Sequence, residues 1–259
     1  MDNATSSRNI LPLAKTSPRR LARSGSNRGR PPAGIGSPAP WDCGSQRAFR
    51  YARIRLMPAH NLGHPHLDQM VVGETGRRPP VVDWDNFPFS GELVIKPFEQ
   101  PELPEPPRHG AAGPAECQSC NRPDSDYLWV DDNWRVSTTA EPPGLPAIVF
   151  LHPRAHHDLG DLTPPLVAEL GSMIFRVERA YTAIGGIARV HMARWGDGGA
   201  HLHLWFYGRP EGFVQARGTW LATWDDILPP QPEAQWRENL RRFGEALLAG
   251  GGRIPTAME

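Results

Sequence analysis

The sequence contains few cysteines, almost no lysine and no long hydrophobic run. Three cysteines in 259 residues cannot form the disulfide framework of a small secreted domain, so they favour a reducing compartment and predict a cytoplasmic protein. No stretch approaches the roughly 18 continuous apolar residues of a membrane-spanning helix, and no secretory signal is visible. Two lysines accompany 26 arginines, which indicates a biased genome composition more than selection for arginine chemistry.

Net charge is zero, but the charges are unevenly distributed along the chain. Residues 1–56 carry an excess of nine positive charges, and the remainder carries an equal excess of negative ones. The first segment is also rich in Ser, Gly and Pro, so it cannot bury enough apolar surface to offset its ordering entropy. Its composition suits a transit peptide, an RNA-binding arm or a dispensable tail. We expect the last of these, and we do not expect a nucleic-acid partner.

Hydrophobic periodicity begins near residue 70. A candidate strand at 92–96 precedes a Pro- and Gly-rich linker at 99–116, which marks a boundary. The chain therefore divides into four predicted segments: a disordered Arg/Ser/Pro-rich arm (1–69), a lead-in with one strand and the linker (70–114), a core (115–210) and a C-terminal helical extension (211–259).

The core is predicted to contain strands interrupted by one long helix. β-Branched and aromatic runs indicate a hairpin, a buried strand and two further strands around a Gly-rich turn; their ranges are 127–130, 134–137, 146–151, 187–194 and 200–207. This order predicts an α+β domain with an antiparallel sheet and one long packed helix.

The helix is predicted to begin at Thr163, a favourable N-cap, with Pro164 at its first position and Gly185 and Gly186 at its end. An apolar stripe at helical spacing supports it: Val167, Leu170, Ile174, Val177, Tyr181 and Ile184. Helical spacing recurs in the extension at Trp236, Leu240, Phe243 and Leu247.

The segment "GGAHLHLWFYGRP" at 198–210 places two histidines two residues apart. In a strand His201, His203 and Trp205 share one face, while Leu202 and the other alternate residues face the core. Taken alone, an H-x-H pair is more often a solvated strand face than a functional site.

A C-x-x-C motif, Cys117 and Cys120, is compatible with a zinc half-site or a redox dithiol. A linker precedes it and a turn follows, which favours zinc. Zinc takes four tetrahedral N or S ligands, so two more must come from elsewhere. Candidates are His201 and the histidines of "HPRAHHDLGDL": His152, His156 and His157.

The ordered set of C-x-x-C, an apolar strand running into P-x-x-H, D-L-x-D-L before a helix, and H-x-H after a Gly-rich turn resembles the histidine-triad (HIT) superfamily over residues 115–210. That superfamily includes nucleoside phosphoramidate hydrolases, dinucleoside polyphosphate hydrolases and hexose-1-phosphate uridylyltransferases. The resemblance implies an antiparallel sheet with a packed helix and a nucleotide or nucleotide-sugar ligand. Relatives are often two-fold dimers, so it also implies a homodimer as a candidate assembly.

The resemblance further implies a structural Zn²⁺ held by Cys117, Cys120, His156 and His201. His157 is an alternative third ligand, since the double histidine leaves the register open by one. His203 matches the position of the family nucleophile.

A neutral imidazole can attack an α-phosphorus if its far nitrogen donates to a fixed acceptor, which sets the tautomer. Backbone amides of the Gly-rich turn are candidate phosphate ligands, and Arg194 is a candidate positive charge. The turn residues are Gly196, Asp197, Gly198 and Gly199.

Trp205 stands where family hydrolases carry a third histidine. Its indole offers one donor and no acceptor, so it either packs against a base or sugar or blocks the leaving-group side. The sequence therefore predicts a nucleotidyl hydrolase or transferase acting through a covalent nucleotidyl-histidine on His203. The alternative is a zinc-stabilised protein that binds a nucleotide or nucleotide sugar without turnover.

Overall fold

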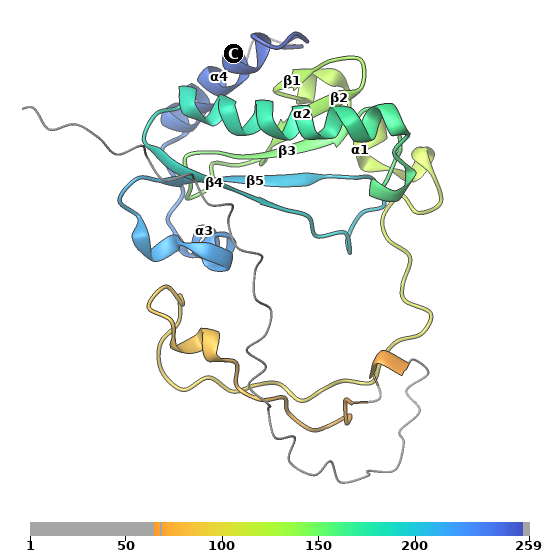
Figure 1. The fold of residues 1–259 in the computed structure, drawn as a ribbon, viewed down its shortest axis with the longest axis vertical. Helices are drawn as coiled ribbons and strands as arrows, with labels where there is room; N and C mark the ends of the chain where they lie inside the picture. Colours follow the sequence, from red (N-terminus) through yellow and green to blue (C-terminus); the bar gives the residue numbers. More distant parts are fainter. Residues whose placement is uncertain (1–64, 68, 256–259) are drawn as a thin grey trace, which may run out of the picture. The chain divides into compact units, whose positions relative to one another are not determined.

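The computed structural model describes residues 65–67 and 69–255. The predicted disordered arm lies outside the described residues except at 65–67 and 69. Five antiparallel strands form one sheet in the order β1-β2-β3-β5-β4, and α2 lies along it (Figure 1). This confirms the predicted α+β class.

The elements are β1 (Trp129–Val130), β2 (Trp134–Thr138), β3 (Ile148–Pro153), β4 (Ile187–Ala193), β5 (Leu204–Pro210), α1 (Gln118–Asn121), α2 (Pro164–Ala180), α3 (Leu221–Ile227) and α4 (Glu233–Leu248). None of the helices in this part of the chain has the length and apolarity to cross a membrane.

The main core lies between the sheet and the pair α2 and α4. Alternate strand residues such as Val149, Leu151 and Phe206 are buried there against Val177 of α2 and Phe243 of α4. The predicted spacing in the extension is confirmed, because its four apolar positions are all buried on one face of α4.

Helix α2 begins as predicted, with Thr163 as N-cap and Pro164 first. The helix ends earlier than predicted, at Ala180, and a 3₁₀ turn at Tyr181–Ala183 leads to Gly185 and Gly186, whose φ values are 81° and 63°. One position of the predicted stripe is wrong: Val167 is 55% exposed. The first turns pack through Leu166 instead, and one residue along a helix rotates the side chain by about 100°.

A second hydrophobic cluster covers the opposite face of β3 and β5. It joins Tyr207 and Ile148 to Leu221 of α3, with Trp205 and Phe213 packed against it. Within the predicted extension (211–259), residues 213–228 therefore cover the second face of the sheet. Figure 1 shows α2 and α3 on opposite sides of the sheet.

Two predicted strands differ in the structure. Residues 92–96 form no strand; the lead-in pairs through isolated bridges, Thr75 with Pro97 and His109 with Gly199, and Val94, with no sheet beside it, is 87% exposed. The strand predicted at 200–207 begins at Leu204, because the Leu202 amide donates to the His157 carbonyl instead of to β3.

Candidate functional site

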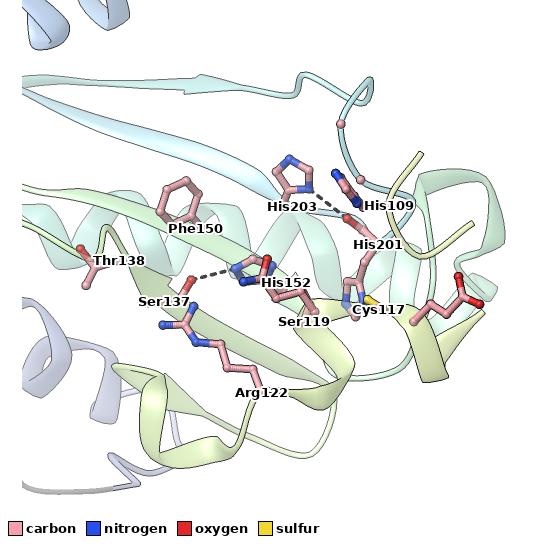
Figure 2. A pocket seen from close by; sticks show the side chains of 14 residues that line it. His109, Cys117, Ser119, Arg122, Ser137, Thr138, Phe150, His152, His201 and His203 are labelled. Carbon is pink, nitrogen blue, oxygen red and sulfur yellow. Dashed lines mark hydrogen bonds between the residues drawn. The ribbon is translucent and has the colours of Figure 1, made fainter. Parts of the chain in front are cut away.

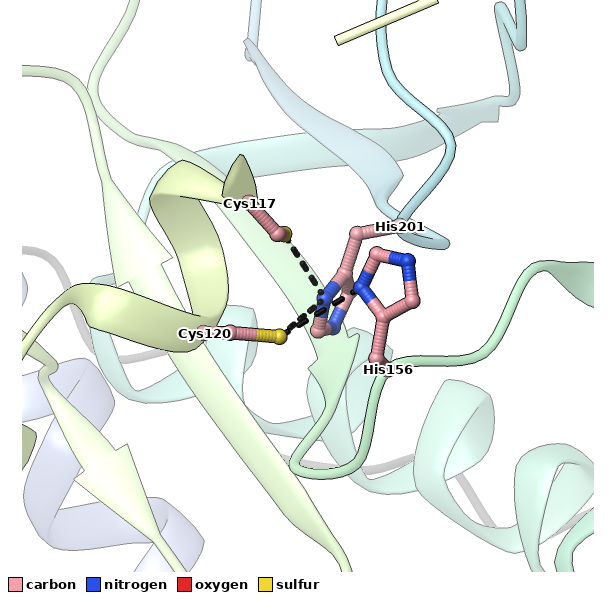
Figure 3. A group of neighbouring side chains, drawn as sticks. All are labelled: Cys117, Cys120, His156 and His201. Carbon is pink, nitrogen blue, oxygen red and sulfur yellow. Dashed lines mark hydrogen bonds between the residues drawn. The ribbon is translucent and has the colours of Figure 1, made fainter. Parts of the chain in front are cut away.

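Four side chains that the sequence singled out as metal ligands meet at one end of the sheet (Figure 3). Cys117 precedes α1 and Cys120 lies within it, so the helical turn directs both sulfurs to one side. His156 follows β3 and His201 precedes β5. The four potential ligand atoms lie within 4.8 Å of one another.

The donor distances fit a tetrahedral zinc ion. His201 Nδ1 lies 3.4 Å from both Cys117 Sγ and Cys120 Sγ, and His156 Nδ1 lies 3.4 Å from Cys120 Sγ. Zn–S bonds of about 2.3 Å and Zn–N bonds of about 2.0 Å give a tetrahedral S···N edge of about 3.5 Å. The His157 side chain is not part of this group; its backbone carbonyl accepts a hydrogen bond from Leu202.

The hydrogen bonds around the group set its donor atoms. His201 Nε2 lies 2.8 Å from the Pro153 carbonyl, which can only accept, so Nε2 carries the proton and the Nδ1 lone pair faces the sulfurs. Burial, and then the hydrogen bond and charge of Cys117, raise the pKa of the Cys120 thiol to about 11. A cation binding here must therefore displace protons.

Gly110 fixes the approach of the chain to this group. Its φ is 75°, and a Cβ there would lie 3.1 Å from Cys117 Cβ and 3.4 Å from the His156 ring. The end of the predicted linker is thus packed against the cysteine and histidine cluster.

A cavity of about 450 Å³ lies beside the cluster (Figure 2). Three imidazoles that face it come from separate segments: His109, His152 and His203. Ser137 and Arg122 also line it, as do Gly198 and Gly199 of the Gly-rich turn.

His203 is held in the tautomer that a nucleophile requires. Its Nδ1 lies 2.9 Å from the His201 carbonyl. Because a carbonyl only accepts, Nδ1 carries the proton and Nε2 carries a free lone pair. The ring lies against the Gly-rich turn, where a Cβ on Gly199 would be 3.6 Å from its Cε1 atom.

His152 is a cavity residue that the sequence suggested only as a zinc candidate. Its Nε2 lies 2.9 Å from Ser137 Oγ, and its Nδ1 is buried without a partner in the described part of the chain. Burial, and then the charges of His201 and His203, lower the pKa of His152 to about 3, so its imidazole is neutral at pH 7. The alternation of β3 could have indicated this: Phe150, on the same face of β3, pairs with Trp205.

Segment 108–110 is held against the Gly-rich turn, a contact that the sequence did not indicate. The His109 amide donates to the Gly198 carbonyl at 3.0 Å, and the Ala200 amide donates to the His109 carbonyl at 2.9 Å. Arg108 donates to the Gly196 carbonyl at 2.9 Å. The amides of residues 196–199 make no hydrogen bond to the described residues, so they are free for an anion.

An ion triplet holds this turn in place. Asp158 binds Arg108 at 2.7 Å and Arg194 at 2.6 Å. Arg194 and the turn residues Gly196 and Asp197 do not line the cavity. The charge of Arg194 is thus directed to Asp158.

Trp205 also lies outside the cavity lining. Its ring packs edge-on to the rings of Phe150 and Trp195, with ring centroids 4.5 Å and 5.5 Å away, and it stacks on the ring of Tyr207. The side chain belongs to the second hydrophobic cluster.

No family model matches the chain, and no curated protein does. Several solved structures that resemble it are histidine triad proteins. A Zn-bound histidine triad family protein from Mycobacterium smegmatis is 22% identical, over 52% of this chain and 95% of that one, with a TM-score of 0.39. A histidine triad protein from Bradyrhizobium japonicum is 22% identical over 47% and 86%, with a TM-score of 0.37. A uridylyltransferase mutant is 22% identical over 52% and 48%, with a TM-score of 0.38.

Proposed function

We propose that the chain is a nucleotide-binding protein that cleaves or transfers a nucleotidyl group at the α-phosphate through His203. The observation that carries this is the hydrogen bond from His203 Nδ1–H to the His201 carbonyl. It leaves the Nε2 lone pair available at a cavity that also holds free backbone amides. This combination is what nucleophilic attack on phosphorus requires.

The reaction has two balanced steps. His203 Nε2 forms a bond to the α-phosphorus while the bond from phosphorus to the leaving oxygen breaks, and that oxygen keeps the electron pair and gains a proton. Water or a second acceptor then attacks the phosphorus while the bond from phosphorus to His203 Nε2 breaks; the nitrogen recovers its electron pair, and the proton of the attacking hydroxyl passes to the base left by the first step. The amides of Gly198 and Gly199 are the proposed donors to the phosphate oxygens.

Apart from His203 and the proposed zinc ligand His201, two imidazoles line the cavity as candidate donors of the leaving-group proton. His152 is excluded, because its pKa is lowered to about 3, so at pH 7 it is a neutral imidazole and not the imidazolium that a general acid requires. His109 is exposed and lines the cavity from segment 108–110. We assign the proton transfer to His109.

The Cys2His2 group is the proposed zinc site. Bound zinc would supply a structural cross-link between α1, the segment after β3 and the segment before β5. The ligand residue His201 also provides the carbonyl that orients His203. The same residue thus connects the proposed metal site to the proposed nucleophile.

The alternative function is nucleotide binding without turnover. It is favoured by Trp205, which is packed in the second hydrophobic cluster and supplies no proton donor to the cavity.

The test is the intact mass of the protein after brief mixing with nucleotide sugars and dinucleoside polyphosphates, followed by an alkaline quench. We expect an adduct of one nucleotide that is absent from His203→Ala and retained in His191→Ala, a histidine outside the cavity. His109→Ala should still form the adduct from an activated donor with a good leaving group, but not from a sugar donor. If wild-type protein binds nucleotides and yields neither adduct nor product, the binding function replaces the enzymatic one.

A further inference from the structure

A second cavity lies at the other end of β5 from His203. Its volume is about 500 Å³. Arg209, which lines it, is six residues beyond His203, so these two residues are about 20 Å apart along the strand. Residues 213–228 pack over Tyr207 between them.

Three arginines line this second cavity. Arg209 comes from β5, Arg189 from β4 and Arg217 from the connection before α3. In the sheet, Arg189 is the direct cross-strand partner of Arg209. His191, also on β4, lines the same space.

These positive charges have no carboxylate partner in the described part of the chain. Arg209 is only 7% exposed, yet it donates just to the carbonyls of Pro210 and Phe213, at 3.3 and 3.0 Å. Arg189 donates to the carbonyl of its neighbour Ala188. Glu211 lines the cavity but makes no ion pair within 4 Å.

This arrangement is unfavourable without a ligand. Like charges directly opposite on neighbouring strands repel, and a buried charge without a counter-ion carries a desolvation penalty. Planar guanidinium groups offer paired donors that match the oxygens of a phosphate. An oxyanion between Arg189, Arg209 and Arg217 would offset both costs.

We propose that this second cavity binds a phosphate group, either inorganic phosphate or the phosphate of a small monoester, at a site separate from His203. Its volume leaves room for a sugar beside the phosphate. The proposal does not depend on the reaction assigned to His203, because none of its residues line the first cavity.

The test is calorimetric titration of the full chain with inorganic phosphate and with ribose 5-phosphate, at constant ionic strength in chloride. We expect binding of one or both ligands in wild-type protein and in His203→Ala. Arg217→Gln should weaken it at least tenfold, whereas Arg179→Gln, an exposed arginine on α2, should leave it unchanged. Tighter binding of ribose 5-phosphate would identify a monoester ligand, and equal binding would identify the phosphate alone.

Thermal unfolding provides a second signature. Without phosphate, Arg189→Gln should be at least as stable as wild type, since it removes a like-charge pair. With phosphate, the wild-type midpoint should rise and that of Arg189→Gln should not. The proposal is refuted if neither ligand binds, or if Arg217→Gln and Arg179→Gln bind them equally.

Discussion

Replacing Asp158 with asparagine should loosen the Gly-rich turn beside His203 while preserving the shape of the side chain. The Asp158 carboxylate lies within 2.7 Å of both Arg108 and Arg194, and it accepts a hydrogen bond from the Leu159 amide. An asparagine can keep the amide contact through its own oxygen. The substitution therefore removes mainly the two charged contacts.

The expected loss follows from the pKa of Asp158. Burial alone would raise this pKa, but the hydrogen bonds from Arg108, Arg194 and the Leu159 amide outweigh burial and lower it to about 2. A decrease of that size from the ordinary value corresponds to about 2 kcal/mol of folding stability. The Asp158 side chain is 18% exposed, so solvent screening reduces this only modestly.

Urea unfolding at pH 7 should show Asp158→Asn to be less stable by up to about 2 kcal/mol. The matched control is Asp197→Asn, an exposed carboxylate in the same turn without an ion pair, which should change little. The contribution of Asp158 is present above the unfolded pKa of about 4 and is lost as pH falls toward 2. The wild-type advantage should therefore shrink below about pH 4. An advantage that is the same at pH 3 and pH 7, or an equal loss in the control, would refute the reasoning.

Two further predictions concern the metal group and the buried imidazole. Cys117→Ser should abolish zinc binding and lower the melting temperature, because site formation and folding are linked. Elemental analysis measures the zinc content and scanning calorimetry measures the melting temperature. Loss of zinc with an unchanged melting temperature would contradict a structural role for the metal. His152 in the folded state takes up its proton only near pH 3, while an unfolded histidine does so near 6.5. The stability of wild type relative to His152→Gln should thus fall between about pH 6.5 and 3, by up to about 1.4 kcal/mol per pH unit in urea titrations; a pH-independent difference would contradict the burial of a neutral imidazole.

Features set by nearby residues were predictable from the sequence. The Thr163–Pro164 start of α2, the hairpin of β1 and β2, and the spacing of Trp236 and Phe243 on α4 each follow from local propensity and periodicity. The order of the motifs, through the resemblance that it carries, also predicted that the four cysteine and histidine side chains form one group, and the structure brings them together.

Features that depend on long-range contacts were not predictable in this way. Segment 108–110 looks like linker, yet His109 bonds to the Gly-rich turn some 90 residues later. Residues 213–228 are too short and irregular to show a period, so their packing on the second sheet face has no local signal. Val94 has the apolar character of a strand but no neighbouring edge with which to pair.

The packing of the second sheet face explains why a tryptophan suits position 205. Once residues 213–228 cover the face of β3 and β5, position 205 lies between Phe150, Trp195 and Tyr207 in an apolar cluster. An imidazole there would bury a polar nitrogen without a partner and fill less volume, whereas the indole leaves only one N–H unsatisfied and gains three aromatic contacts. The covering segment and the tryptophan at position 205 thus fit one another. The proposed proton donor for the leaving group therefore comes from outside the H-x-H strand, on segment 108–110, which holds His109 at the cavity through its hydrogen bonds to the Gly-rich turn.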